Sequence, residues 1–192
     1  MGNELQGRTV AFVTANEGVE EVELNTPWEA VRAAGGTPVL LAPKKGTVQA
    51  FNHLDKGGVL TADRATSEVS VEDFDALVLP GGVANPDQLR TDRAAVELVR
   101  AFFDTGRPVA VICHGPWTIV EADRVRNRTM TSWPSLQTDI RNAGGHWVDE
   151  EVQVCTGGPN MLISSRKPDD LVAFCAKLVE VFSQSERRTS AA

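Results

Sequence analysis

The stretch Pro108-Val-Ala-Val-Ile-Cys-His-Gly-Pro116 decides the fold of this chain. Its run Val109–Ile112 is apolar and mostly β-branched, which is typical of a strand buried on both faces of a parallel sheet. Pro116 favours the first turn of a helix, because the N–H that it lacks would have no partner there. The stretch therefore predicts a strand, a sharp turn at Cys113 and a helix, which is the layout of a nucleophile elbow.

The position of Cys113 on that turn is the main functional signal. A lone cysteine is usually a small buried hydrophobe, but a cysteine that only packs would more simply lie inside the strand. At the turn, the N–H groups and the dipole of the following helix favour the thiolate. We therefore predict that Cys113 is a nucleophile, whereas Cys155 and Cys175 lie in ordinary strand and helix patterns and are interpreted as packing residues.

The composition excludes several classes of partner. The 192 residues suit a single domain over 1–192, with a core at about 8–182 and a polar tail at 183–192. The net charge of −7, without a Lys/Arg run, predicts no nucleic-acid partner.

No apolar stretch is long enough to span a membrane and the N-terminus lacks a secretory pattern, so we expect a cytoplasmic protein. Three widely spaced cysteines without a CxxC pair predict no disulfide framework, no metal and no cofactor.

Strands and helices are expected to alternate along the chain. Buried strands are predicted at 8–14, 37–42, 75–79 and 109–112, and helices at 22–34, 92–105, 136–143 and 168–182. This order predicts an α/β fold with a mainly parallel sheet, in which ligands bind beyond the carboxyl ends of the strands. Smaller features are interpreted as a polar loop at 15–21, a hairpin from 46 with a turn at Gly57-Gly58, and an edge strand at 67–71.

Two carboxyl groups are candidates for activating the thiol. Glu20 and Glu23 are three residues apart and share a face at the start of the first predicted helix, so one of them can point inward. Glu17 and Glu21 are expected to stay in water, because acidic residues favour a helix N-terminus in any case. We predict that Glu20 is the carboxyl at the site.

The remaining candidates lie in the other two strand-end loops. Gly81-Gly82 can supply backbone N–H groups and, with the N–H of His114, form an oxyanion hole, although Gly-Gly is also compatible with a plain tight turn. The His114 side chain need not contact Cys113, because adjacent side chains usually diverge. Asp87 is the best candidate to orient it. The other two histidines, His53 and His146, are interpreted as structural or surface residues.

Four motifs, in this order, resemble the PfpI (intracellular protease I) family, which belongs to the superfamily of the Parkinson-associated deglycase. They are Thr14-Ala-Asn-Glu-Gly-Val-Glu-Glu-Val-Glu-Leu24, Asp75-Ala-Leu-Val-Leu-Pro-Gly-Gly82, Val111-Ile-Cys-His-Gly-Pro116 and Asn142-Ala-Gly-Gly145. The resemblance runs from about residue 8 to 182. It implies a flavodoxin-like three-layer sandwich, a reactive Cys113 with His114 beside it, a carboxyl at Glu20, and oxyanion donors from Gly82 and His114.

The resemblance also implies partners and activities. In some members the histidine pairs with an acidic residue of a neighbouring subunit; Asp87 stands there, with a shorter reach than the glutamate of the archaeal proteases. Trp133 stands where those proteins carry a tyrosine. Members are usually homodimers, sometimes hexamers. Their activities predict a stress-response hydrolase, a deglycase or glyoxalase acting on a small carbonyl or a glycated protein. The alternatives are an intracellular cysteine peptidase, and a redox sensor or holding chaperone with an oxidisable Cys113.

Overall fold

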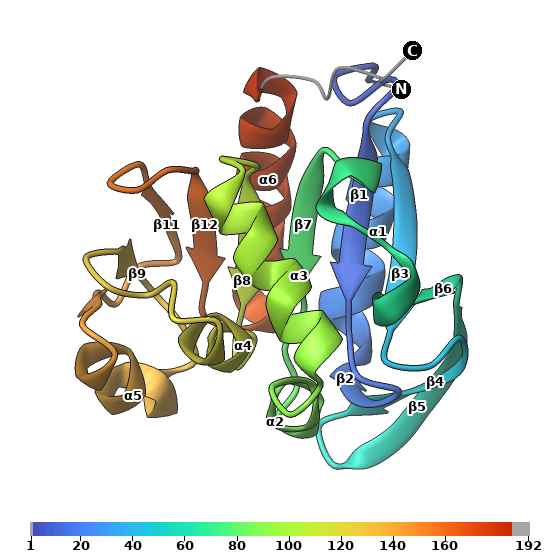
Figure 1. Cartoon of the computed structure of the whole chain (residues 1–192), viewed down its shortest axis with the longest axis horizontal. Helices are drawn as coiled ribbons and strands as arrows, with labels where there is room; N and C mark the ends of the chain where they lie inside the picture. The colour runs from blue at the N-terminus through green and yellow to red at the C-terminus, as the bar shows by residue number, and fades with distance from the viewer. Residues whose placement is uncertain (1, 186–192) are drawn as a thin grey trace.

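The computed structural model describes residues 2–185, which fold into a sheet with helices on both faces (Figure 1). Within this range the main sheet has seven strands. Across the sheet they are β11 (Val152–Cys155), β12 (Leu162–Ser165), β8 (Val109–Ile112), β7 (Ala76–Leu79), β1 (Thr9–Val13), β3 (Thr37–Ala42) and β6 (Arg64–Ala65). Neighbouring strands are parallel except β11 and β12. The predicted α/β fold with a mainly parallel sheet is confirmed.

The pleat of the strands divides the core into two halves. In β1, Ala11 and Val13 point to the face covered by α3 (Arg93–Asp104), α4 (Pro116–Glu121) and α5 (Gln137–Asn142). Val10 and Phe12 point to the other face, covered by α1 (Glu21–Ala33) and α6 (Leu171–Gln184). Because both faces are buried, the central strands are apolar throughout, and the molecule has three layers.

The helices begin where the sequence supplies a cap or a proline. Asp92 is the N-cap of α3, and its side chain accepts the N–H of Ala95 at 2.8 Å. Pro116 is the first residue of α4. The helical turn Pro168–Asp170 leads into α6, and another, Pro134–Leu136, leads into α5. Each start lies close to the boundary that the sequence predicts.

Two smaller sheets lie outside the main one in the described part of the chain. One contains β2 (Glu17–Glu20), β4 (Gly46–Asn52) and β5 (Asp55–Ala62), and the other β9 (Thr129–Met130) and β10 (His146–Trp147). The predicted polar loop at 15–21 is wrong, because β2 pairs with β4. The chain of the hairpin reverses direction between β4 and β5. The turn predicted at Gly57-Gly58 is wrong, because these residues lie inside β5.

Three further details differ from the sequence predictions. An edge strand was expected at 67–71, but the segment instead contains two 3₁₀ turns, Thr66–Glu68 and Val71–Asp73. A helix, α2 (Ala84–Leu89), follows Gly81-Gly82, where only a loop was expected. Of the predicted tail at 183–192, the first two residues belong to α6, and 186–192 lie outside the described residues.

At both edges of the main sheet, a side chain forms a hydrogen bond with a backbone N–H or carbonyl group. At one edge, the short strand β6 pairs with the end of β3, and the Asp63 carboxylate accepts the N–H of Leu40 at 2.8 Å. At the other edge, Gln153 Nε2 donates to the carbonyl oxygen of Val154 at 2.9 Å.

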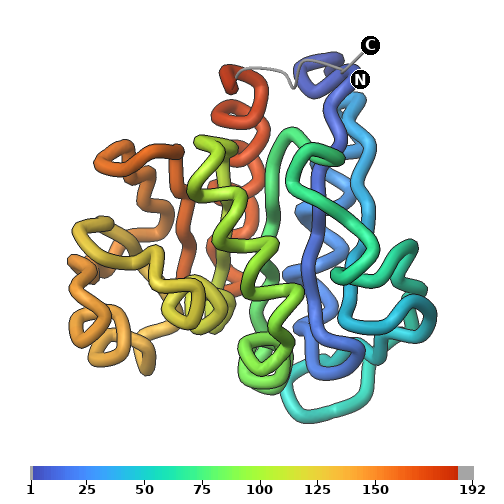
Figure 2. The backbone as a smooth tube through the Cα atoms, viewed as in Figure 1, coloured from blue at the N-terminus to red at the C-terminus, as the bar shows by residue number. Residues whose placement is uncertain are grey.

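The carboxyl ends of β1, β7 and β8 lie at the same end of the molecule. Figures 1 and 2 show α2, α4 and the β4–β5 hairpin gathered there. The three loops that the sequence singled out therefore come together at this edge, as expected for a parallel sheet. No helix within residues 2–185 combines the length and the apolar character needed to cross a membrane.

Candidate active site

Cys113 lies on a strained turn between β8 and α4. Its φ of 60° is a left-handed conformation that few residues other than glycine adopt. Its N–H donates to Ser165 O at 3.1 Å, and its carbonyl accepts the N–H of Trp133 at 2.9 Å, so the turn is held from both sides. The residue is 6% exposed and lines a cavity of about 230 Å³. This strand–turn–helix geometry agrees with the expected elbow, and the reactivity of the thiol stays a prediction.

The carboxyl beside the thiol belongs to Glu23 and not to Glu20. Glu23 Oε2 accepts the N–H of Gly81 at 2.9 Å, and the carboxyl interacts with the Cys113 thiol. The prediction of Glu20 for this place is therefore corrected. The reason is local: Glu20 ends β2 and is the N-cap of α1, whereas Glu23 lies in the first helical turn and faces the sheet. Both carboxyls line the cavity.

Glu23 and Cys113 form a coupled pair. Burial raises the pKa of Glu23 to about 8, so its carboxyl is protonated at neutral pH. Burial also raises the pKa of the Cys113 thiol, and a negative charge on Glu23 adds to that rise. The pair therefore loses its first proton near pH 8. When the sulfur carries the resulting charge, the carboxyl that keeps its proton can donate a hydrogen bond to it.

Two backbone N–H groups point at the Cys113 sulfur, those of Gly82 and His114. They are two of the three donors predicted for the oxyanion hole. The prediction of Gly81 as the third donor is corrected, because its N–H donates to the Glu23 carboxyl instead. Hydrogen bonds from the remaining pair favour a negative sulfur or oxygen at this point.

Replacing Gly82 with alanine is expected to disturb the site. A Cβ there would lie 2.3 Å from Gly18 O, and the φ of 83° would strain any L side chain. We expect Gly82→Ala to lose about 1–3 kcal/mol of stability and to slow Cys113 alkylation, because the N–H moves away from the sulfur. Thermal unfolding and iodoacetamide labelling measure the two effects.

The matched control is Gly46→Ala. Gly46 also has a left-handed φ, of 107°, but a Cβ there would meet nothing within 4 Å. This variant should lose stability without slowing the alkylation of Cys113. Equal labelling rates in both alanine variants would contradict a role for the Gly82 N–H.

His114 contacts the thiol more closely than adjacency in the chain suggests. Its Nδ1 lies 3.2 Å from Cys113 Sγ, because the left-handed turn folds the two side chains together. The ring stacks on Trp133 at 5.7 Å between centroids and meets Trp117 edge-on at 5.4 Å. Ser135 Oγ lies 3.5 Å from its Nε2. Burial lowers the pKa of His114 to about 4, so the imidazole is neutral above that pH.

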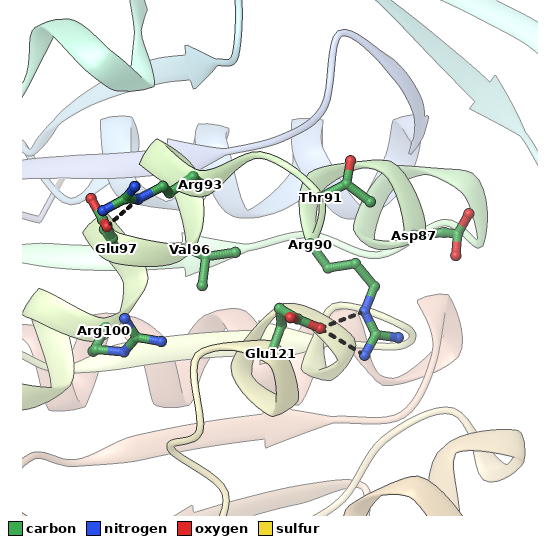
Figure 3. Close-up of a pocket in the computed structure, with 8 residues that line it drawn as sticks. All are labelled: Asp87, Arg90, Thr91, Arg93, Val96, Glu97, Arg100 and Glu121. Atoms are coloured by element: carbon green, nitrogen blue, oxygen red, sulfur yellow. Dashed lines mark hydrogen bonds and ion pairs between the residues drawn. The ribbon is translucent and has the colours of Figure 1, made fainter.

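Asp87 lies outside the cavity of Cys113. It is exposed on α2, at one end of a groove of about 640 Å³, and pairs of Arg90 with Glu121 and Arg93 with Glu97 line the same groove (Figure 3). Among the described residues, it is not one of those that line the Cys113 cavity. Its pairing with His114 of another subunit, in a dimer or hexamer, stays a prediction.

Sequence reasoning missed two residues that shape the site. Buried Asn85 accepts the N–H of Ala15 at 2.7 Å and donates to the carbonyl oxygens of Pro80 and Gly81, each at 3.0 Å. It thereby joins the loops after β1 and β7; the Asn-Pro pair shortly after Gly81-Gly82 is the signal that could have identified it. His53, interpreted as a structural or surface residue, lies at the tip of the β4–β5 hairpin and lines the cavity.

The other two cysteines have different surroundings. Burial raises the pKa of Cys175 to about 11. Although burial opposes it, hydrogen bonds from the N–H groups of Thr129 and Gly157 and the charge of Arg128 hold the pKa of Cys155 below its ordinary value. Among the described residues, neither cysteine lines the Cys113 cavity. Within residues 2–185, no group of three or more His, Cys, Asp or Glu side chains is arranged to hold a metal ion.

Comparisons with known proteins agree with this geometry. The model of the DJ-1/PfpI family matches residues 8–181. Deglycase PH1704 of Pyrococcus horikoshii is 39% identical over 172 residues, covering 90% of this chain and 98% of that protein. Protein/nucleic acid deglycase 2 of Escherichia coli is 38% identical over 169 residues, covering 87% of this chain and 93% of that protein.

The solved structures show the same fold. A ThiJ/PfpI domain protein from Brachyspira murdochii superimposes with a TM-score of 0.84 at 22% identity, over 94% of this chain and 99% of that chain. The family model and the two relatives cover nearly all of the described residues. This chain therefore belongs to the DJ-1/PfpI family, as its four motifs predict, and its relatives in that family include proteins named as deglycases.

Proposed function

We propose that this protein is a cysteine-dependent hydrolase that converts 2-oxoaldehydes such as methylglyoxal, free or bound to proteins, into 2-hydroxy acids. The observation that carries the proposal is the set of groups around the Cys113 thiol: the protonated Glu23 carboxyl and the N–H groups of Gly82 and His114. Such a set suits addition of a thiolate to a carbonyl. The similarity to proteins named as deglycases supports the same class of reaction.

The first step is addition of the Cys113 thiolate to the aldehyde carbon, which forms a C–S bond and an oxyanion. The N–H groups of Gly82 and His114 donate to that oxyanion, and Glu23 transfers its proton to it. With an adduct on a thiol or an amine, the Cys113 sulfur replaces the thiol or amine at the same carbon. The product of this step is a hemithioacetal on Cys113.

The next step moves hydrogen within the substrate. The Glu23 carboxylate takes the proton from the former aldehyde carbon while the ketone oxygen gains one from water, which gives an enediol. Glu23 then returns its proton to the former ketone carbon, and the hydroxyl on the first carbon loses its proton to water. The first carbon is thereby oxidised to a thioester and the second is reduced to an alcohol. No external oxidant or reductant is needed. Water then hydrolyses the thioester, which releases the 2-hydroxy acid and restores Cys113. The neutral imidazole of His114, 3.2 Å from the sulfur, is placed to orient that water.

The experiment is the measurement of lactate formed from methylglyoxal by the full chain. Wild type and the control Cys175→Ser, altered in the buried face of α6, should form lactate above the buffer background. Cys113→Ser should form none above it. Release of lactate from a preformed N-acetylcysteine adduct, compared with the spontaneous breakdown of that adduct, extends the assay to bound substrates. Equal lactate from wild type and Cys113→Ser would overturn the proposal.

Two alternatives give different outcomes in the same set of proteins. A peptidase would cleave casein in a Cys113-dependent way without forming lactate. It needs an acid for the leaving amine, which His114 with Asp87 would have to supply in an oligomer. A redox sensor or holding chaperone would form no product and would oxidise at Cys113 under mild peroxide, with Glu23 bonded to the oxidised sulfur. Mass spectrometry of intact protein after peroxide treatment detects the second alternative.

A further inference from the structure

The tip of the β4–β5 hairpin forms one wall of the Cys113 cavity. It contributes His53 and Leu54, and Val83 and Trp133 also line the cavity. The side chain of Leu54 is 92% exposed and that of Val83 57% exposed, so apolar groups face water at the entrance. A substrate that carries an apolar group next to its carbonyl would cover them.

A buried carboxylate holds this wall in place. Glu20 is 8% exposed, and its two oxygens lie 3.1 and 3.4 Å from the backbone nitrogen of His53, whose N–H donates to them. His53 has a left-handed φ of 59°, so the tip needs support from outside the hairpin. The neighbouring Glu21 holds a different part: it accepts from Asn52 Nδ2 at 3.1 Å and from Gly58 N–H at 2.9 Å.

The charges in the cavity favour the same kind of substrate. Among the described residues that line it, none is a lysine or an arginine, whereas Glu20 and Glu23 are both present. A substrate with a carboxylate or phosphate next to its carbonyl would find no counter-charge there. An uncharged, apolar substituent meets Leu54, Val83 and Trp133 instead.

Resting on the function proposed above, we propose that Glu20 is a positioning residue that holds the hairpin tip over Cys113, and that the wall so formed selects carbonyl compounds with a bulky apolar substituent over those with an anionic one. Glu20 acts in two separable ways. Its oxygens accept the N–H of His53, and its charge repels anions. Leu54 supplies the apolar contact.

The test uses alkylation of Cys113, which needs no turnover. Phenacyl bromide, iodoacetamide and iodoacetate offer an apolar, a neutral and an anionic group next to the reacting carbon. The rate of each with Cys113 is divided by its rate with free N-acetylcysteine. In the wild type, this ratio should fall in the order phenacyl bromide, iodoacetamide, iodoacetate. A ratio for iodoacetate equal to or above that for phenacyl bromide would overturn the proposal.

The variants separate the two effects of Glu20. Leu54→Ala and Glu20→Leu should each lower the selectivity for phenacyl bromide over iodoacetamide by about tenfold, the usual size of one apolar contact. Glu20→Gln keeps an acceptor for the His53 N–H, so it should keep that selectivity while the relative rate with iodoacetate rises several-fold. The matched control, Glu21→Gln, should change neither. Unchanged selectivity in both Glu20→Leu and Leu54→Ala would contradict the role of the wall.

Hydrogen exchange gives a readout that does not depend on the cavity chemistry. The His53 amide should exchange at least about tenfold faster in Glu20→Leu than in Glu20→Gln, because only glutamine still accepts its N–H. If wild type forms no lactate but the labelling selectivity and the exchange behave as stated, the proposed function fails and the role of Glu20 stands. If lactate forms but the exchange rates of the two variants agree, the role of Glu20 fails alone.

Discussion

Turnover of methylglyoxal by the Glu23→Gln variant is expected to be about 10²- to 10⁴-fold slower than in the wild type, the usual loss when a general acid–base group is removed. Glutamine keeps the shape of the side chain and the acceptor for the Gly81 N–H. It cannot release a proton to the oxyanion or take one from carbon. The loss should therefore appear in kcat more than in KM, because Glu23 acts on the reacting atoms after binding.

Lactate formation under saturating methylglyoxal measures this loss. Glu21→Gln is the control, because Glu21 is next to the same helix start but bonds to the hairpin and not to Cys113. Unchanged turnover in Glu23→Gln would reduce Glu23 to a support for Gly81, and the proton transfers would then need another group.

The same pair predicts how alkylation of Cys113 depends on pH. Below about pH 8 the Glu23–Cys113 pair holds both protons, and above it one is lost, so the rate should rise with pH around that point. His114, with a pKa lowered to about 4, should add no step near neutral pH. Glu23→Leu removes the donor to the thiolate and should slow alkylation at neutral pH by about 10- to 100-fold, the size of a hydrogen bond to a charged group. A step near pH 6.5, the ordinary range of histidine, would contradict the neutral His114.

The free energy of unfolding of Glu23→Gln is expected to exceed that of the wild type by about 3 kcal/mol at neutral pH. In the folded protein burial raises the pKa of Glu23 from 4.5 to about 8. Between these two values the folded carboxyl keeps its proton while the unfolded one loses it, so rising pH favours the unfolded wild type. Glutamine does not titrate, and the difference between the two proteins should grow from about pH 4.5 to about pH 8 and then stay constant.

Urea unfolding at several pH values measures this difference. Glu21→Gln again serves as the control, because it removes one half-buried carboxylate from the same segment and should show no such growth with pH. If the free energies of unfolding of wild type and Glu23→Gln changed in parallel with pH, Glu23 would ionise in the folded protein as it does in the unfolded chain. The two predictions on this residue are opposite in sign: the substitution that removes activity strengthens the fold.

Much of the fold could be predicted because single elements carried strong local signals. The run Val109–Ile112 is typical of a strand buried on both faces, and Pro116 indicates where the next helix begins. The alternation around them determines the parallel sheet. β2 and α2 were missed for a common reason: each is short, and each is held by a contact distant in the chain. β2 pairs with β4, and Asn85 of α2 bonds to Ala15.

The candidate site was predicted only to the level of loops. Cys113, Gly82 and His114 lie together because parallel strands end at one edge of the sheet, and the alternation of strands and helices in the sequence predicts that arrangement. The choice between Glu20 and Glu23 depends on where α1 begins, and helix starts cannot be located from sequence to within one residue. The contact of His114 with Cys113 depends on the left-handed backbone at Cys113, which no side-chain pattern reports.

The side chains at the two edges of the sheet bear on how copies of this protein meet at high concentration. An open strand edge can recruit a further strand and begin aggregation. Here the Asp63 carboxylate occupies the N–H of Leu40 beside the two-residue β6, and Gln153 occupies the Val154 carbonyl on β11. Joining two sheets edge to edge would require breaking one of these bonds. At the β6 edge it would also bring the Asp63 carboxylate close to the incoming backbone. Stable assemblies of this chain should therefore form through its helices and loops, and concentrated stocks should resist gelation by strand addition.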